Sequence, residues 1–296
     1  MPNPWLYYKI CVGEFNGAID HMVAEVLPDL MASIGASRWF YLRYFDEEDG
    51  LHVRLRFQVP AGTEQESRRI VLSEISDALL RIPRLPQGTY APLVILADII
   101  FPPHRLGVYE AEYEPEIDKY GGGIGLGDAE RMFCVSTQIA VETLRLENAG
   151  IESRKTMAPC FMAAVLETVP IDSPPAKFLE DYSRRWLPPD LTQSKMLRDE
   201  FFDKASELLD DGISVVTPDE ALPEGAVKLV GQWRAALVQA AAFYRAHREL
   251  GADFAGSQAW QWIHLMNNRL GFSPFEEAYL STLLEAHYRG ATARVS

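Results

Sequence analysis

An alternating run of ionisable side chains lies at positions 52–56, where the sequence reads His52-Val53-Arg54-Leu55-Arg56. Successive side chains of a β-strand point to opposite faces, so His52, Arg54 and Arg56 share one face. Guanidinium groups bind carboxylates and phosphates through paired hydrogen bonds. The run therefore predicts an anion-binding surface. The alternative is a face that is paired with acidic side chains of neighbouring elements.

The strand expected just before this run has aromatic side chains on both faces. The alternation places Tyr41 and Arg43 on one face and Phe40, Leu42 and Tyr44 on the other. We expect the second, apolar set to lie in the core. Arg43 would then extend the cationic surface, unless it forms a surface salt bridge.

His264 lies in a segment with helical periodicity, on the same side as Trp260, Asn267 and Asn268. An asparagine one turn away can hold an imidazole in one tautomer. The neighbours are polar on one side and large and apolar on the other, which suits a half-buried site with a tuned pKa. The alternative is a structural histidine.

A glycine-rich segment, residues 121–127, contains five glycines in seven positions. Such segments can bind anions through backbone N–H groups. This one lacks the phosphate-loop pattern and fits the dinucleotide fingerprint only loosely. It therefore predicts a flexible active-site loop, with Asp128 capping the helix that follows.

The elements that must position these residues change type along the chain. Strands are expected early, with a hairpin closed by the turn at 46–50, and helices dominate later. We predict an α+β fold, in which a mixed sheet from the N-terminal half is covered by a mostly helical C-terminal half. We treat 1–296 as a single domain, strand-rich over 1–127 and helix-rich over 128–296. Strands are expected at 5–12, 38–45, 51–59 and 106–113, and helices at 18–34, 64–82, 128–146, 156–169, 176–186, 192–209, 225–250, 257–270 and 274–288.

Composition excludes several classes of protein. The 296 residues include 28 Lys and Arg against 42 Asp and Glu, a formal net charge of −14, so we expect no direct nucleic-acid binding. The three cysteines are scattered, which predicts a reduced, cytoplasmic protein. We expect no membrane association and no metal centre. Signatures of serine hydrolases, zinc proteases and kinases are missing.

Four segments in series resemble one family, the lantibiotic dehydratase C-terminal or thiopeptide-type bacteriocin biosynthesis family. The resemblance spans essentially the whole chain. Its motifs are W-x-Y-x-K-I/L at 5–10, W-F-x-x-R-Y-x-D…H-x-R-x-R-F at 39–57, Y-x-x-E-x-x-R-Y-G-G at 113–122 and H-x-x-x-N-R-L at 264–270.

The resemblance implies a tailoring enzyme for ribosomally made peptides. One branch of the family removes glutamate from glutamylated Ser or Thr, leaving dehydroalanine or dehydrobutyrine. Another branch, the pyridine synthases, joins two dehydroalanines in a formal [4+2] cycloaddition and releases the leader peptide. The expected partners are a precursor peptide with its leader and a separate tRNA-dependent glutamylating protein. No cofactor is expected.

Matching residue by residue, the family's elimination arginines fall on Arg54 and Arg56, and its catalytic histidine falls on His264. Its third arginine is Lys119 here, which keeps the charge but loses the bidentate fork. Around these catalytic residues we expect substrate-binding roles for Arg43, His52, Tyr120, Asn268 and Tyr279.

These assignments predict an elimination with His264 as acid and base, and with Arg54 and Arg56 as a clamp for the glutamyl carboxylates. Lys119 would assist one of these roles. The hypothesis expects the hairpin arginines and His264 to serve one peptide-sized cleft. Cycloaddition, with hydrogen bonds from His264, Ser273 and Tyr279, is the second hypothesis. A non-catalytic scaffold that binds the precursor peptide is the third.

Overall fold

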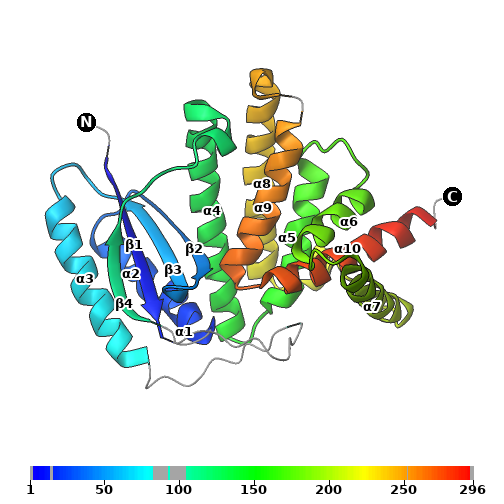
Figure 1. Cartoon of the computed structure of the whole chain (residues 1–296), viewed down its shortest axis with the longest axis horizontal. Coiled ribbons are helices and arrows are strands. Elements are labelled where there is room, and N and C mark those ends of the chain that lie inside the picture. The colour runs from blue at the N-terminus through cyan, green and yellow to red at the C-terminus, as the bar shows by residue number, and fades with distance from the viewer. Residues whose placement is uncertain (1–2, 14–15, 83–92, 94–104, 252, 294–296) are drawn as a thin grey trace. The chain divides into compact units, whose positions relative to one another are not determined.

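A computed structural model describes residues 3–13, 16–82, 93, 105–251 and 253–293 (Figure 1). The chain divides into two compact units. The first comprises residues 1–91 and 96–142, and the second comprises 92–95 and 143–296. The predicted α+β class is confirmed, because the first unit holds a small sheet and the second is helical.

The sheet of the first unit has four strands in the order β2-β3-β1-β4. They are β1 (Trp5–Val12), β2 (Arg38–Asp46), β3 (Gly50–Gln58) and β4 (Leu106–Ala111). Every pairing among these described strands is antiparallel, whereas a mixed sheet was predicted. β1 is central and rich in aromatic and β-branched residues, which favour strands.

The turn between β2 and β3 forms where it was predicted. The backbone N–H of Asp49 donates to Oδ1 of Asp46 at 2.7 Å, a local bond that closes the turn. Gly50 follows with a φ of 68°, a conformation that favours glycine. The hairpin therefore fixes the register in which Arg54 faces Lys9 of β1 and Leu42 of β2.

One face of the sheet is buried under helices. The helix predicted at 18–34 is present as α1 (Asn16–His21), a π-helical turn η1 (Met22–Val26) and α2 (Leu27–Ser33). α3 (Glu64–Arg81) packs against β1 and β4 (Figure 1). The fully buried side chains on this face include Tyr8, Ile10, Val53, Leu55 and Phe57.

Arg43 lies on this buried face, so the expectation that it extends the cationic surface is wrong. Its Nη2 contacts Oδ1 of Asp20 on α1 at 2.5 Å, and the Arg43 side chain is 3% exposed. Alternation predicts which residues share a face, but β2 is aromatic on both faces and does not reveal which one is covered. Tyr44, expected in the core, is accordingly exposed.

The Asp20–Arg43 pair predicts a large loss of stability in Asp20→Ala. Removing one partner leaves a buried charge without its counter-ion, which costs about 3–5 kcal/mol. Glu66→Ala removes the partner of exposed Arg69 and should cost under about 1 kcal/mol. Urea unfolding of both variants measures the difference. Equal losses in the two variants would contradict the structural role of the buried pair.

The glycine-rich segment is helical, which corrects the prediction of a flexible loop. α4 runs from Gly122 to Asn148 and so includes Gly122–Gly127. Glycine weakens a helix by about 1 kcal/mol per residue without forbidding it. Asp128 consequently lies inside the helix, where it pairs with Arg131 at 2.7 Å rather than capping. The boundary predicted at residue 128, between a strand-rich and a helix-rich part of the chain, therefore lies inside α4.

The second unit consists of helices whose predicted positions are confirmed to within a few residues. α8 and α9 pack against α5, and α10 packs against α6 and α7. No helix in the described part of the chain is long and apolar enough to cross a membrane. The helices are α5 (Arg154–Thr168), α6 (Pro175–Trp186), α7 (Leu191–Asp210), α8 (Glu224–Ala246), α9 (Phe254–Leu270) and α10 (Pro274–Ala293), with short 3-10 turns at 219–221 and 248–250.

Candidate functional site

The guanidinium of Arg56 lies in an aromatic cage on the face of the sheet opposite α3. Its Cζ is 4.4 Å from the ring centre of Tyr7, 5.4 Å from that of Tyr113 and 5.7 Å from that of Phe40. Nε and Nη1 are buried, and no described residue accepts a hydrogen bond from either. Burial lowers the pKa of this guanidinium, partly opposed by nearby Tyr7 and Tyr113. A cation held by rings keeps its N–H donors for an anion.

A groove of about 840 Å³ lies beside the cage within the first unit. Tyr7 and Tyr113 contact Arg56 and also line the groove, together with Trp5, Leu126 and other residues. Its size falls in the range of small-molecule and side-chain pockets. The cage therefore adjoins a space that can admit part of a ligand.

Arg54 is held on the same face by three neighbours. Its Cζ stacks 3.2 Å from the ring centre of Tyr44. Its Nε donates to Nε2 of His52 at 3.4 Å, and its Nη2 lies 3.7 Å from Oδ2 of Asp46. Its side chain remains 23% exposed. The planar group is thus oriented but still accessible.

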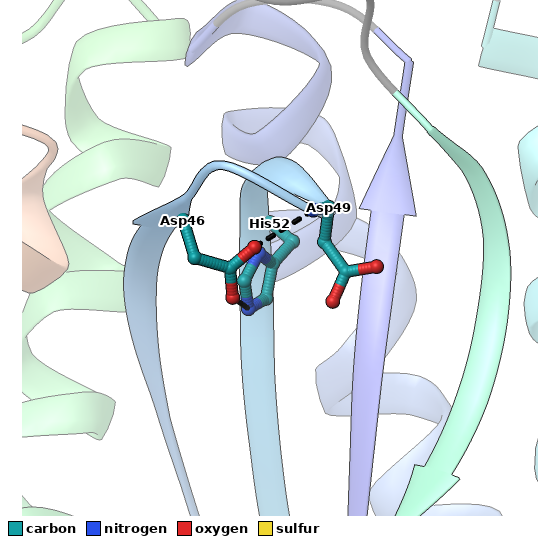
Figure 2. A group of neighbouring side chains, drawn as sticks. All are labelled: Asp46, Asp49 and His52. Carbon is teal, nitrogen blue, oxygen red and sulfur yellow. Dashed lines mark hydrogen bonds and ion pairs between the residues drawn. The ribbon is translucent and has the colours of Figure 1, made fainter.

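Asp46, Asp49 and His52 form a cluster whose potential ligand atoms lie within 4.8 Å of one another (Figure 2). Two cations already bind Asp49, with Lys9 Nζ at 2.6 Å from Oδ2 and Arg105 Nη1 at 2.8 Å from Oδ1. With Arg54 beside Asp46, three cations face two carboxylates. We interpret the cluster as an ion-pair network that supports Arg54 rather than as a metal centre.

His52 is completely buried, which corrects the expectation that it contacts the substrate. Its Nδ1 lies 2.9 Å from the carbonyl oxygen of Gly50 and donates to it, which leaves Nε2 to accept from Arg54. Burial lowers the pKa of His52 below 6.5. The side chain therefore serves as a neutral support for Arg54.

This burial predicts an acid-sensitive first unit. Below pH 6.5 the unfolded chain binds a proton at position 52 that the folded chain does not, so stability falls as pH decreases towards the lowered pKa of His52. The slope attributable to His52 is at most about 1.4 kcal/mol per pH unit. His52→Asn keeps a donor for Gly50 and should remove this slope. Urea unfolding between pH 5 and pH 8, about the range in which histidine titrates, measures it; an unchanged slope in His52→Asn contradicts the prediction.

Lys119 and Tyr120 follow β4 in a short 3-10 turn, η3 (Asp118–Tyr120). Lys119 Nζ lies 3.1 Å from Oε2 of Glu116, whose charge also acts on Arg56. The Tyr120 ring is buried edge-to-face against Phe133 at 5.2 Å. Tyr120 is therefore a core residue, contrary to the substrate-binding role expected for it.

In the second unit, His264 of α9 is bound by a carboxylate that the sequence did not point to. Nδ1 lies 2.9 Å from Oε1 of Glu277 on α10, and the Glu277 side chain is 1% exposed. The imidazole also packs against Trp186 at 4.6 Å and against Trp260 at 5.5 Å between ring centres. The predicted proximity of Trp260 is confirmed, but the partner of Nδ1 is Glu277 rather than an asparagine.

Tyr182 of α6 completes this cluster, which sequence reasoning also missed. Its hydroxyl donates to Oε2 of Glu277. Burial raises the pKa of the Glu277 carboxyl, and the His264 imidazole opposes that rise. A glutamate in the first turn of a helix is common for reasons unrelated to catalysis, so only the fold reveals this contact.

The two other residues expected to bind substrate lie elsewhere in the second unit. Tyr279 is buried edge-to-face against Phe201 at 5.2 Å, within a cluster of α7 and α10 side chains. Its ring has a packing role, and its substrate role remains a prediction. Asn268 is half-buried on α9, and its substrate role remains a prediction.

The chain matches the family described as lantibiotic biosynthesis dehydratase C-term over residues 5–288, and it therefore belongs to that family. This membership confirms the resemblance seen in the four sequence motifs. No curated protein matches the chain significantly.

Solved structures share the fold. The pyridine synthase TbtD from thiomuracin biosynthesis aligns with a TM-score of 0.69 and 16% identity, over 99% of both chains. The tRNA-dependent lantibiotic dehydratase MibB from Microbispora sp. 107891 aligns with a TM-score of 0.61 and 22% identity, and TsrL aligns with 0.62 and 17%, over 96% of its length. The alignment covers 99% of this chain but only 28% of MibB. The family supports a role in tailoring ribosomally made peptides.

Proposed function

We propose that this protein eliminates glutamate from glutamylated Ser or Thr residues of a precursor peptide, leaving dehydroalanine or dehydrobutyrine. Arg54 and Arg56 bind the glutamyl carboxylates and stabilise the negative charge that develops. His264 removes the α-proton. Lys119 assists one of these roles through its charge.

The proposal rests on one observation, the buried guanidinium donors of Arg56 that are unpaired within the described part of the chain. The departing glutamate is an anion, and the caged guanidinium has two buried donors, Nε and Nη1, for which no described residue is an acceptor. Arg54 lies two residues along the same strand face and is kept accessible. Two oriented guanidinium groups suit a ligand that carries more than one carboxylate.

The partners follow from the same chemistry. An eliminating enzyme needs a substrate that already carries the glutamyl ester. We propose a separate tRNA-dependent glutamylating protein as its source, by analogy with MibB, which is described as tRNA-dependent. The substrate itself is a leader-bearing precursor peptide.

Cycloaddition of two dehydroalanines, with release of the leader, is the second candidate. It is favoured by the full-length alignment with TbtD, which covers 99% of both chains. His264 would again act as a general acid or base in this reaction. The buried position of Tyr279 weakens this candidate, because the tyrosine was expected to bond to the reacting peptide.

Parallel incubations separate the two candidates and the scaffold alternative. The protein is given a leader-bearing peptide with one glutamylated serine, and separately the same leader with two dehydroalanines. Elimination predicts loss of one glutamic acid from the first peptide only. Leader release from the second peptide alone supports cycloaddition, and binding of either peptide without a mass change supports a scaffold.

A further inference from the structure

The imidazole of His264 has one nitrogen bound within the protein and one available. Nδ1 lies 2.9 Å from Oε1 and 3.2 Å from Oε2 of Glu277. An ionised carboxylate accepts hydrogen bonds but cannot donate, so the proton between them belongs to Nδ1. No described residue bonds to Nε2, and the His264 side chain is 24% exposed. The basic lone pair of the neutral ring therefore lies on Nε2.

Glu277 is itself held in place from a third helix. Its side chain is 1% exposed, and the hydroxyl of Tyr182, which is also buried, donates to its Oε2. A buried carboxylate is tolerated only when hydrogen bonds or a cation compensate its charge. The Nδ1–H of His264 and the hydroxyl of Tyr182 supply that compensation.

Aromatic walls limit the motion of the ring. Trp186 and Trp260 stack on each other at 5.2 Å between ring centres, and both contact the imidazole. Arg185 lies over Trp260 at 5.1 Å. The ring thus has one hydrogen-bonded edge and two packed neighbours, a geometry that preserves a single orientation.

We propose that Glu277 is a positioning residue that holds His264 in the Nδ1–H tautomer and presents Nε2 as the base, while Tyr182 keeps Glu277 in place. The tautomer follows from these contacts with Glu277 ionised. The catalytic consequence rests on the proposed elimination.

In that reaction Nε2 takes the proton from Cα of the glutamylated residue. The electron pair of the C–H bond first remains as an enolate-like carbanion that can take a proton back from the imidazolium. The pair then forms the Cα–Cβ double bond, and the Cβ–O bond breaks with its pair on the departing glutamate carboxylate. The imidazolium that forms is stabilised by the negative charge of Glu277, and its proton returns to solvent. This division of roles is the one that a carboxylate–histidine pair performs in other enzymes.

Nitrogen NMR of the whole protein, labelled with ¹⁵N-histidine, tests the tautomer in the wild type. The His264→Gln spectrum assigns the signal among the six histidines. Once the ring is neutral, we expect the proton on Nδ1. A neutral ring protonated on Nε2 overturns the proposal, whether or not the protein eliminates glutamate.

The Glu277→Gln variant tests whether the negative charge of Glu277 fixes the tautomer of His264. The amide of the variant can accept from Nδ1–H or donate to Nδ1, so it no longer selects one tautomer of the His264 ring. We expect the share of the Nδ1–H tautomer of the neutral ring to fall in the NMR spectrum of this variant. The elimination rate should fall by about tenfold or more, within the contribution of a general base.

The control is Glu285→Gln, which neutralises another buried carboxylate of α10 that pairs with Arg198. It should leave the tautomer of His264 unchanged. An unchanged tautomer of His264 in Glu277→Gln refutes the positioning role. Absence of glutamate release by the wild type refutes the proposed function instead, and it leaves the NMR result intact.

Discussion

Arg56→Ala is expected to lower kcat/KM for glutamate release by about 10²- to 10³-fold, the loss typical when an electrostatic donor is removed from a site of developing charge. The reason lies in the cage, where rings stabilise the guanidinium and no described residue accepts a hydrogen bond from Nε or Nη1. Truncation removes the anion-binding group without breaking an ion pair of the fold. The loss should therefore appear in turnover rather than in folding.

Two variants make this result specific. Arg56→Lys keeps the charge but not the bidentate fork, so it should recover only part of the rate. Arg69→Ala removes an exposed arginine of the same unit and should leave the rate unchanged. If Arg56→Ala turns over like Arg69→Ala, Arg56 is a packing residue and the carboxylate clamp is wrong.

His264→Ala is expected to lower the elimination rate by about 10²- to 10⁴-fold, the contribution of a well-placed general base. It should also abolish exchange of the substrate α-proton with deuterated solvent, because that exchange requires the same base. Mass spectrometry of peptide recovered from D₂O measures the exchange directly.

His247→Ala is the matched control. His247 is also half-buried, packs against Phe243 at 4.1 Å between ring centres and lies 2.9 Å through Nδ1 from a backbone carbonyl oxygen, but no carboxylate among the described residues bonds to it. The His247→Ala protein should exchange the substrate α-proton and release glutamate at the wild-type rate. Wild-type exchange in His264→Ala would assign the base to another group.

Much of the fold follows from local pattern. Apolar residues at helical spacing place the helices of the second unit, and the acidic turn ending in Gly50 identifies the hairpin. The same alternation that defines β3 places Arg54 and Arg56 on one face, as predicted. These features depend on neighbours in sequence, so the sequence alone reveals them.

The errors involve contacts between distant segments. The side of β2 that α1 covers decides the position of Arg43, and nothing within the aromatic strand specifies it. Likewise, Glu277 reaches His264 from the next helix, and Tyr182 reaches Glu277 from a third. The glycine-rich run is helical although its local propensity is weak, because glycine lowers the stability of a helix without forbidding it.

The most direct measurement is the time course of free glutamate released by the wild-type protein from a leader-bearing peptide with a single glutamylated serine. We expect glutamate to appear in step with a dehydroalanine product of matching mass, with both signals lost in Arg56→Ala and His264→Ala. A peptide that stays fully glutamylated in the presence of active, folded protein would contradict the proposed elimination.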